Sequence, residues 1–199
     1  MPKTGPLVPL LDALNDLVAW FQAAHVSGVV IGGVAASLLG RPRVTRDVDA
    51  MVFVSEAEWA GFLSLGAQFG FVPRRADAIE FAKTARVLLV QHGASGIDVD
   101  VVFGALPFEE EALARAVQVE ISGIRVPLPS PEDLIIMKAV AHRPRDLADI
   151  ESVMDAHPTL DIGRIRRWVR EFANALEMPD IFDDTNKILN LHETHKGKK

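Results

Sequence analysis

The chain has 199 residues, of which 49% are hydrophobic and 24% charged, and its formal net charge is −6. This size is enough for one domain with its own core, or for one domain with a small helical extension. No stretch approaches the roughly 18 apolar residues of a membrane span, and prolines and acids interrupt the start, unlike a signal peptide. The absence of cysteine excludes disulfides, thiolate zinc sites and cysteine nucleophiles. We expect a soluble, cytoplasmic protein with no membrane partner, and the negative charge argues against a broad nucleic-acid surface.

The first predicted elements are a helix, a strand and a second short helix. Residues 9–25 carry apolar side chains at three- and four-residue spacings, which predicts an amphipathic helix packed on a sheet. Residues 29–31 predict a buried strand that ends at Gly32 and Gly33, where the backbone must turn sharply or let a ligand approach closely. The small residues 34–39 suit a short helix, whose N-terminal N–H groups would favour phosphate.

A pair of carboxylates begins the next predicted strand, over residues 47–53. Asp47 and Asp49 are two positions apart, so both side chains should lie on one face of the strand. Two aligned carboxylates beside a glycine turn form the type of oxygen site that Mg²⁺ needs when it also holds substrate phosphates. The preceding segment contains three arginines, and the last of them, Arg46, adjoins Asp47.

Residues 55–103 predict a helix and then a hairpin. Ser55 and Glu58 match a capping box at the start of a helix that runs to about residue 68. Two further strands are predicted, over residues 86–92 and 97–103. On the second strand, Asp98 and Asp100 share the face opposite to the apolar residues, so both carboxylates are candidate site residues.

The remainder of the chain is predicted to be mainly helical. Ser130, followed by a proline and two acids, is typical of a helix N-terminus. A soft boundary near this residue separates a core over 1–129 from a helical C-terminal part over 130–191 that packs on it. We expect residues 192–199 to form a disordered tail.

The glycine turn and the carboxylate pair together resemble a known superfamily. Gly32-Gly33, followed about fourteen residues later by Asp47-Val48-Asp49, is similar to the signature of the polymerase-β-like nucleotidyltransferases. The wider segment, GGVAASLLGRPRVTRDVD, is closest to small bacterial members around the AbiEii-type toxins and the aminoglycoside nucleotidyltransferases. The resemblance implies an α+β nucleotidyltransferase fold, with a small mixed sheet flanked by helices and a helical C-terminal extension.

The resemblance also implies roles for individual residues. The family's third carboxylate lies in a Val-Asp followed by three apolar residues and Gly, which residues 99–104 match. Asp100 is therefore favoured, and Asp98 is the reserve candidate because a shift of two keeps the same face. Two Mg²⁺ ions would be held by Asp47, Asp49 and Asp100. The nucleoside triphosphate would be bound by Gly32, Gly33, Arg46 and Lys138.

Lys138 belongs to a run that resembles a segment of the toxin-type relatives. By that resemblance its ammonium group reaches the nucleotide phosphates, while the alternative is an ordinary exposed lysine. Arg145 stands where relatives often carry lysine, which keeps the charge but not lysine-specific chemistry. Asp146 and Asp149 could be substrate-side acids, or could equally pair with arginines and hold two helices together.

The implied function is the metal-dependent transfer of a nucleoside monophosphate from a triphosphate to an acceptor hydroxyl. We expect RNA or tRNA as acceptor slightly more than a small aminoglycoside-like molecule. In the RNA case the chain would be the toxin of a toxin–antitoxin pair, with an antitoxin protein as a partner. A basic helix over residues 162–176 could contact RNA phosphates, although surface arginines are common. The remaining alternative is a catalytically inactive nucleotide-binding or partner scaffold.

Overall fold

The structure, a computed structural model, describes residues 8–196, with side chains to residue 194. The chain forms two compact units. The first comprises Met1–Val34 and Val44–Leu128, and the second comprises Ala35–Arg43 and Pro129–Lys199. In the described part of the chain, no helix has both the length and the apolar character needed to cross a membrane.

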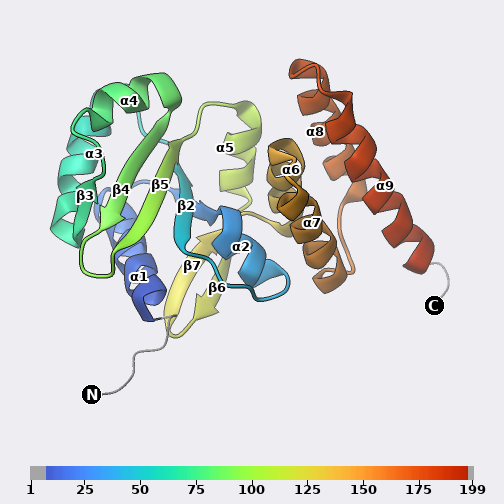
Figure 1. Cartoon of the computed structure of the whole chain (residues 1–199), viewed down its shortest axis with the longest axis horizontal. Helices are drawn as coiled ribbons and strands as arrows, with labels where there is room; N and C mark the ends of the chain where they lie inside the picture. Colours follow the sequence, from blue (N-terminus) through green and yellow to red (C-terminus); the bar gives the residue numbers. More distant parts are fainter. Residues whose placement is uncertain (1–7, 197–199) are drawn as a thin grey trace. The chain divides into compact units, whose positions relative to one another are not determined.

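The first unit is built on a mixed sheet of five strands in the order β1-β2-β5-β4-β3 (Figure 1). Strands β2 and β5 are parallel, while the other neighbouring strands run antiparallel. A separate ribbon is formed by β6 and β7. The elements in chain order are α1 (Val8–Ala23), β1 (Gly28–Ile31), α2 (Gly32–Leu39), β2 (Asp47–Val52), η1 (Glu56–Glu58), α3 (Trp59–Gly66), η2 (Ala67–Phe69), β3 (Phe71–Pro73), α4 (Ala78–Ala85), β4 (Val87–His92), β5 (Ile97–Phe103), α5 (Pro107–Ala114), β6 (Val117–Ile121) and β7 (Ile124–Leu128). Of these, α2 begins in the first unit and continues in the second.

Helices α1 and α3 cover one face of this sheet with aromatic side chains. The Trp20 ring of α1 stacks on Phe62 of α3 and on Phe71 of β3, with centroids 4.4 and 5.1 Å apart. Trp59, the first residue of α3, stacks on Phe103 of β5 at 4.1 Å. Aromatic pairs of this kind contribute about 0.5–1.5 kcal/mol beyond the area that they bury. This face is therefore a main part of the core of the unit. The opposite face carries polar side chains together with the buried Val29 and Met51.

The helix predicted after Ser55 is present, but it is divided into η1, α3 and η2. The predicted capping box is wrong, because the Ser55 side chain makes no bond to the helix backbone. It donates instead to the Glu58 carboxylate, at 2.5 Å. Short 3-10 turns satisfy backbone groups at helix ends without a side-chain cap, and Gly70, with φ 82°, ends the segment.

The second unit is helical. Its elements besides the end of α2 are α6 (Pro131–Ala141), α7 (Pro144–Ala156), α8 (Ile162–Ala175) and α9 (Pro179–Lys196). The hydroxyl of Ser130 accepts a hydrogen bond from the Asp133 N–H at 3.2 Å, which is the predicted N-cap. Leu134 and Ile165, on α6 and α8, are fully buried in its core.

Residues 192–196, which the sequence places in a tail, continue helix α9 as far as Lys196. Arg166 of α8 pairs with Glu193 at 2.7 Å, which ties the end of α9 to its neighbour. Thr194 also donates to the Asn190 carbonyl at 2.8 Å. Residues 197–199 lie outside the described part of the chain.

Candidate active site

Four carboxylates lie on the sheet face that α1 and α3 do not cover. In the parallel pairing of β2 with β5, Asp47 stands beside Asp98 and Asp49 stands beside Asp100. Paired residues on neighbouring strands point to the same side of a sheet, and successive residues alternate. The aspartates therefore face away from Phe103 and the aromatic core. The structure thus brings Asp47, Asp49 and Asp100 together on one face.

The glycine turn lies directly against one of these carboxylates. Gly32 begins α2 with φ 64°, and a Cβ atom at this position would lie 1.9 Å from the Oδ2 atom of Asp49. Only glycine combines this backbone conformation with such a close approach. Gly33 is the next residue of the same helix. The predicted phosphate-binding turn and the predicted carboxylate pair are therefore neighbours in space.

An arginine that the sequence does not single out, Arg74, contacts the carboxylates from the β3 edge of the sheet. Arg74 follows β3, and its backbone N–H donates to the Leu89 carbonyl of β4 at 3.0 Å. Its guanidinium donates to Asp98 at 3.0 Å and also to Asp100. Gln91 of β4 donates to the other oxygen of Asp98 at 2.9 Å. No local pattern in the sequence indicates that this arginine lies beside the strand of Asp98 and Asp100.

The environment of Asp100 makes its carboxyl harder to ionise than that of an ordinary aspartate. Burial raises the pKa of the Asp100 carboxyl, and the negative charges of Asp47 and Asp98 add to this effect. The Arg74 guanidinium lowers the pKa but does not reverse the shift. A carboxylate with a raised pKa is a better proton acceptor than an ordinary aspartate.

The carboxylates fit Mg²⁺ in donor chemistry and in strand register, since Mg²⁺ is bound by oxygen ligands. Within the described residues, however, no group of three or more histidine or carboxylate side chains is arranged to hold a metal ion as it stands. Asp100 is hydrogen-bonded to Arg74 instead.

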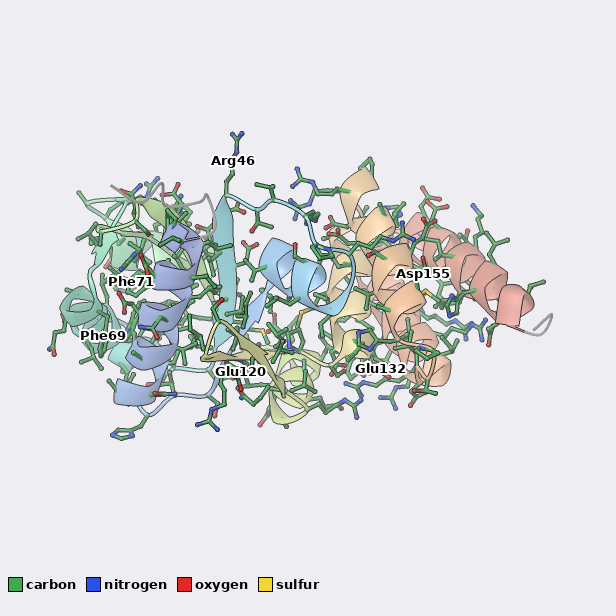
Figure 2. The ribbon with its side chains drawn as sticks, turned by 90° about the horizontal axis from the view of Figure 1, so that it is seen from below. Arg46, Phe69, Phe71, Glu120, Glu132 and Asp155 are labelled. Carbon is green, nitrogen blue, oxygen red and sulfur yellow. The ribbon has the colours of Figure 1, made fainter. Side chains whose placement is uncertain are left out.

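Arg46 is exposed at the residue before β2, and Figure 2 shows its side chain extending away from the ribbon. An exposed arginine at this place is available to a charged ligand. Its binding to nucleotide stays a prediction.

Lys138 lies in the second unit and is not an ordinary exposed lysine. Its ammonium nitrogen is 2.8 Å from a carboxylate oxygen of Asp146 and 2.8 Å from one of Asp149, and its side chain is 9% exposed. Asp149 also accepts two hydrogen bonds from Arg43, each 3.0 Å long. These carboxylates therefore hold α6, α7 and the residues 35–43 together. The phosphate-binding role of Lys138 stays a prediction.

The predicted basic helix, α8, uses two of its four arginines inside the second unit. Arg164 pairs with the fully buried Asp133 of α6 at 2.8 Å. Arg166 donates to Asn186 and Asn190 of α9, at 3.0 and 2.7 Å. Arg167 and Arg170 are exposed, and the Arg170 guanidinium also lies 4.5 Å from the ring centroid of Phe182 on α9.

The mixed sheet, the glycine turn against an Asp-x-Asp strand and the aspartates on its parallel neighbour agree with the class of protein that the sequence predicts, a nucleotidyltransferase. The chain belongs to the family described as "Nucleotidyltransferase of unknown function (DUF6036)", whose model matches residues 9–188. The predicted membership of the nucleotidyltransferases and the predicted α+β fold class are confirmed. None of the curated proteins compared with this chain matches it.

Two solved structures share the fold. An antigenic nucleotidyltransferase-like protein from Paracoccidioides brasiliensis is 18% identical, with 88% of this chain and 92% of that chain covered and a TM-score of 0.53. The lincosamide antibiotic adenylyltransferase LnuA, in its lincomycin-bound structure, is 12% identical, with 71% and 94% covered and a TM-score of 0.50. At these identities the two structures support the fold alone.

Proposed function

We propose that this protein transfers a nucleoside monophosphate from a nucleoside triphosphate to an acceptor hydroxyl, with Mg²⁺ as cofactor and pyrophosphate as the leaving group. The observation that carries the proposal is the alignment of Asp49 with Asp100 on one sheet face, with the Gly32 backbone against Asp49. Nucleotidyl transfer requires a phosphate-binding backbone beside oxygen ligands for a metal, and a helix start next to aligned carboxylates supports this proposal.

Each residue has a distinct proposed role. Asp47, Asp49 and Asp100 would hold two Mg²⁺ ions, which when bound offset phosphate charge and lower the pKa of the acceptor hydroxyl. The N–H groups at the start of α2, where Gly32 and Gly33 lie, would bind the triphosphate. The Asp100 carboxylate would take the proton of the attacking hydroxyl. Arg46 and Lys138 would offset the charge of the phosphates.

Asp100 is a better third carboxylate than Asp98 on two grounds. It is paired in register with Asp49, next to the glycine turn. Both oxygens of Asp98 already accept hydrogen bonds, from Gln91 and from Arg74. We therefore expect Asp100→Ala to reduce transfer far more than Asp98→Ala.

We favour a small hydroxyl-bearing molecule as the acceptor. Two of the four arginines on α8 are bonded within the second unit, which leaves a smaller basic surface for RNA than the sequence suggests. The net charge of −6 also argues against RNA as the acceptor. LnuA, which shares the fold, is a lincosamide antibiotic adenylyltransferase. RNA modification by a toxin with an antitoxin partner is the alternative, and the exposed Arg167 and Arg170 are the feature that favours it.

Thermal-shift titration tests the proposed enzyme. We expect a nucleoside triphosphate to raise the melting temperature only when Mg²⁺ is present, and Asp47→Asn or Asp49→Asn to abolish transfer while the fold stays intact. Indifference to all four nucleotides, with and without metal, would support the inactive scaffold. Near-normal turnover in either variant would show that the site is assigned wrongly.

Labelling identifies the acceptor. The protein is incubated with α-labelled triphosphates and either purified RNA or a set of aminoglycosides and lincosamides. RNA labelling that decreases steeply with salt and is lost in Arg167→Glu/Arg170→Glu would favour RNA. Labelling of a small molecule that the same double variant leaves unchanged would support our proposal.

A further inference from the structure

Arg74 and the glycine turn lie on opposite flanks of the carboxylates. The turn follows β1, at one edge of the five-stranded sheet, while Arg74 follows β3, at the other edge. Asp49 is on β2, beside the turn, and Asp100 is on β5, on the side of Arg74. The triphosphate is proposed to bind at the turn. Arg74 is on the other side, next to Asp100, the carboxylate proposed to receive the proton of the acceptor hydroxyl.

The Arg74 guanidinium is held independently of Asp100. Its backbone N–H is bonded to Leu89, and one guanidinium nitrogen donates to Asp98 at 3.0 Å. Asp98 is itself held by Gln91 at 2.9 Å. The second nitrogen of the same fork donates to Asp100. Because the guanidinium is planar and rigid, fixing one side of it also fixes the other.

We propose that Arg74 is a positioning residue, held by Asp98 and Gln91, that orients the Asp100 carboxylate for the acceptor hydroxyl. This inference rests on the proposed function. It assigns Asp98 a role as well, which is to hold Arg74 and not to bind metal. A positioning residue acts on the chemical step and leaves nucleotide binding at the opposite flank unchanged.

Steady-state kinetics of Arg74→Met provide the first test. Loss of a group that orients a reacting ligand typically costs about 10–100-fold in activity, so we expect kcat to decrease by about that factor. The KM for the triphosphate and the nucleotide-induced thermal shift should stay within about twofold. Asp98→Asn should reduce kcat in the same way but less, because the amide oxygen still accepts a hydrogen bond.

Two further variants make this test specific. Arg74→Lys should restore only part of kcat, because an ammonium group cannot bridge two carboxylates as a planar fork does. Arg75→Met is the matched control, because it removes the same charge at the next residue. Arg75 pairs with the exposed Asp77 at 2.9 Å and not with the site carboxylates, so its kinetics should be unchanged.

A second readout needs neither nucleotide nor metal. In urea unfolding, Arg74→Met should lower the urea midpoint more in the wild-type background than in the Asp100→Asn background. In the second background the carboxamide at position 100 is uncharged, so Arg74 has no ion pair with it to lose. Arg75→Met should lower the midpoint equally in both backgrounds. Equal shifts for Arg74→Met in the two backgrounds would show that the contact does not exist in solution.

The remaining outcomes separate this inference from the proposed function. A wild-type enzyme that transfers nucleotide, with an Arg74→Met variant whose kcat stays within about twofold, would overturn the role of Arg74 alone. An unchanged kcat with a raised KM for the triphosphate would show that Arg74 binds nucleotide, which also overturns it. A wild-type protein that neither binds Mg²⁺ with nucleotide nor transfers would overturn both.

Discussion

A side chain at position 32 would overlap with the carboxylate of Asp49, which is a proposed metal ligand. Gly32 has φ 64°, and a Cβ atom would fall 1.9 Å from the Asp49 carboxylate. A side chain there must displace either the start of α2 or the carboxylate. The glycine therefore serves both backbone geometry and the proposed site.

Gly32→Ala should reduce both stability and nucleotide binding. Backbone strain at such a position costs about 1–3 kcal/mol, and the displaced Asp49 should weaken the metal-dependent thermal shift. Gly96→Ala is the control, because Gly96 has φ 70° but a Cβ atom there would meet no described atom within 4 Å. Urea unfolding and nucleotide titration of both variants provide the measurement. If Gly96→Ala lost nucleotide binding equally, the proximity to Asp49 would not be the cause.

Asp100 should make the stability of the apoprotein depend on pH. Because burial and the neighbouring carboxylates raise its pKa, the folded state binds more protons than the unfolded state between their two pKa values. The stability that this group contributes is therefore present below the unfolded value, about 3.9 for aspartate, and decreases as the pH rises through the folded value. The free energy of unfolding of Asp100→Asn relative to wild type should increase over this range. A difference that is the same at every pH would contradict the raised pKa.

At the scale of elements, α8 is both a core helix and a carrier of charge. Arg164 reaches the fully buried Asp133 of α6, while Arg166 binds α9 near its end. Ion pairs of this kind orient neighbouring helices, and they reduce the number of arginines that face solvent. An amphipathic pattern with arginines on its polar side does not reveal which of them are bonded to other helices.

Arg164→Met should destabilise the protein strongly. Removing one partner of a buried ion pair costs about 3–5 kcal/mol, because the other charge is left without compensation. Arg167→Met, on the same helix and exposed, should change the free energy of unfolding by less than about 0.5 kcal/mol. Guanidinium unfolding of the two variants would compare them directly. Similar losses in both would mean that helix propensity, and not the Asp133 pair, sets the stability.

At the scale of the whole molecule, the chain leaves the first unit after Val34 and returns to it at Val44. The intervening residues are bonded to α7 of the second unit. A Cβ atom on Gly40 would lie 2.6 Å from the Ser152 hydroxyl, and Arg43 pairs with Asp149. The second unit therefore includes a segment that precedes the Asp-x-Asp strand by only a few residues.

Asp149→Ala should release this segment. Asp149 pairs with Arg43 and with the nearly buried Lys138. Because Lys138 keeps Asp146 as a partner, the loss of Asp149 should cost about 1.5–3 kcal/mol and speed tryptic cleavage after Arg43. Asp155→Ala removes the exposed pair with Arg41 and should cost about 0–1 kcal/mol. Unfolding curves and the mass of the first tryptic fragments would report both effects. Resistance of Asp149→Ala to cleavage would show that other contacts hold the segment.

The sequence by itself determined the local chemistry of the candidate site. Period-two alternation places Asp47 and Asp49 on one face of a strand, and a strand-terminal Gly-Gly indicates a close approach, because both features depend only on backbone geometry over a few residues. The same alternation left Asp98 and Asp100 equivalent. The family resemblance favoured Asp100, and the register of β5 on β2 adds a physical reason, because it aligns Asp100 with Asp49.

Only the tertiary structure decided which charged side chains have partners. Arg74 reaches Asp98 and Asp100 from a strand that is distant in sequence, and Lys138 is enclosed by two acids of α7. Each of these contacts depends on how chain segments meet across the fold, which no short-range pattern records. The pairing of a charge is a property of the space around it, whereas its place on a strand or helix is a property of the neighbouring residues in the chain.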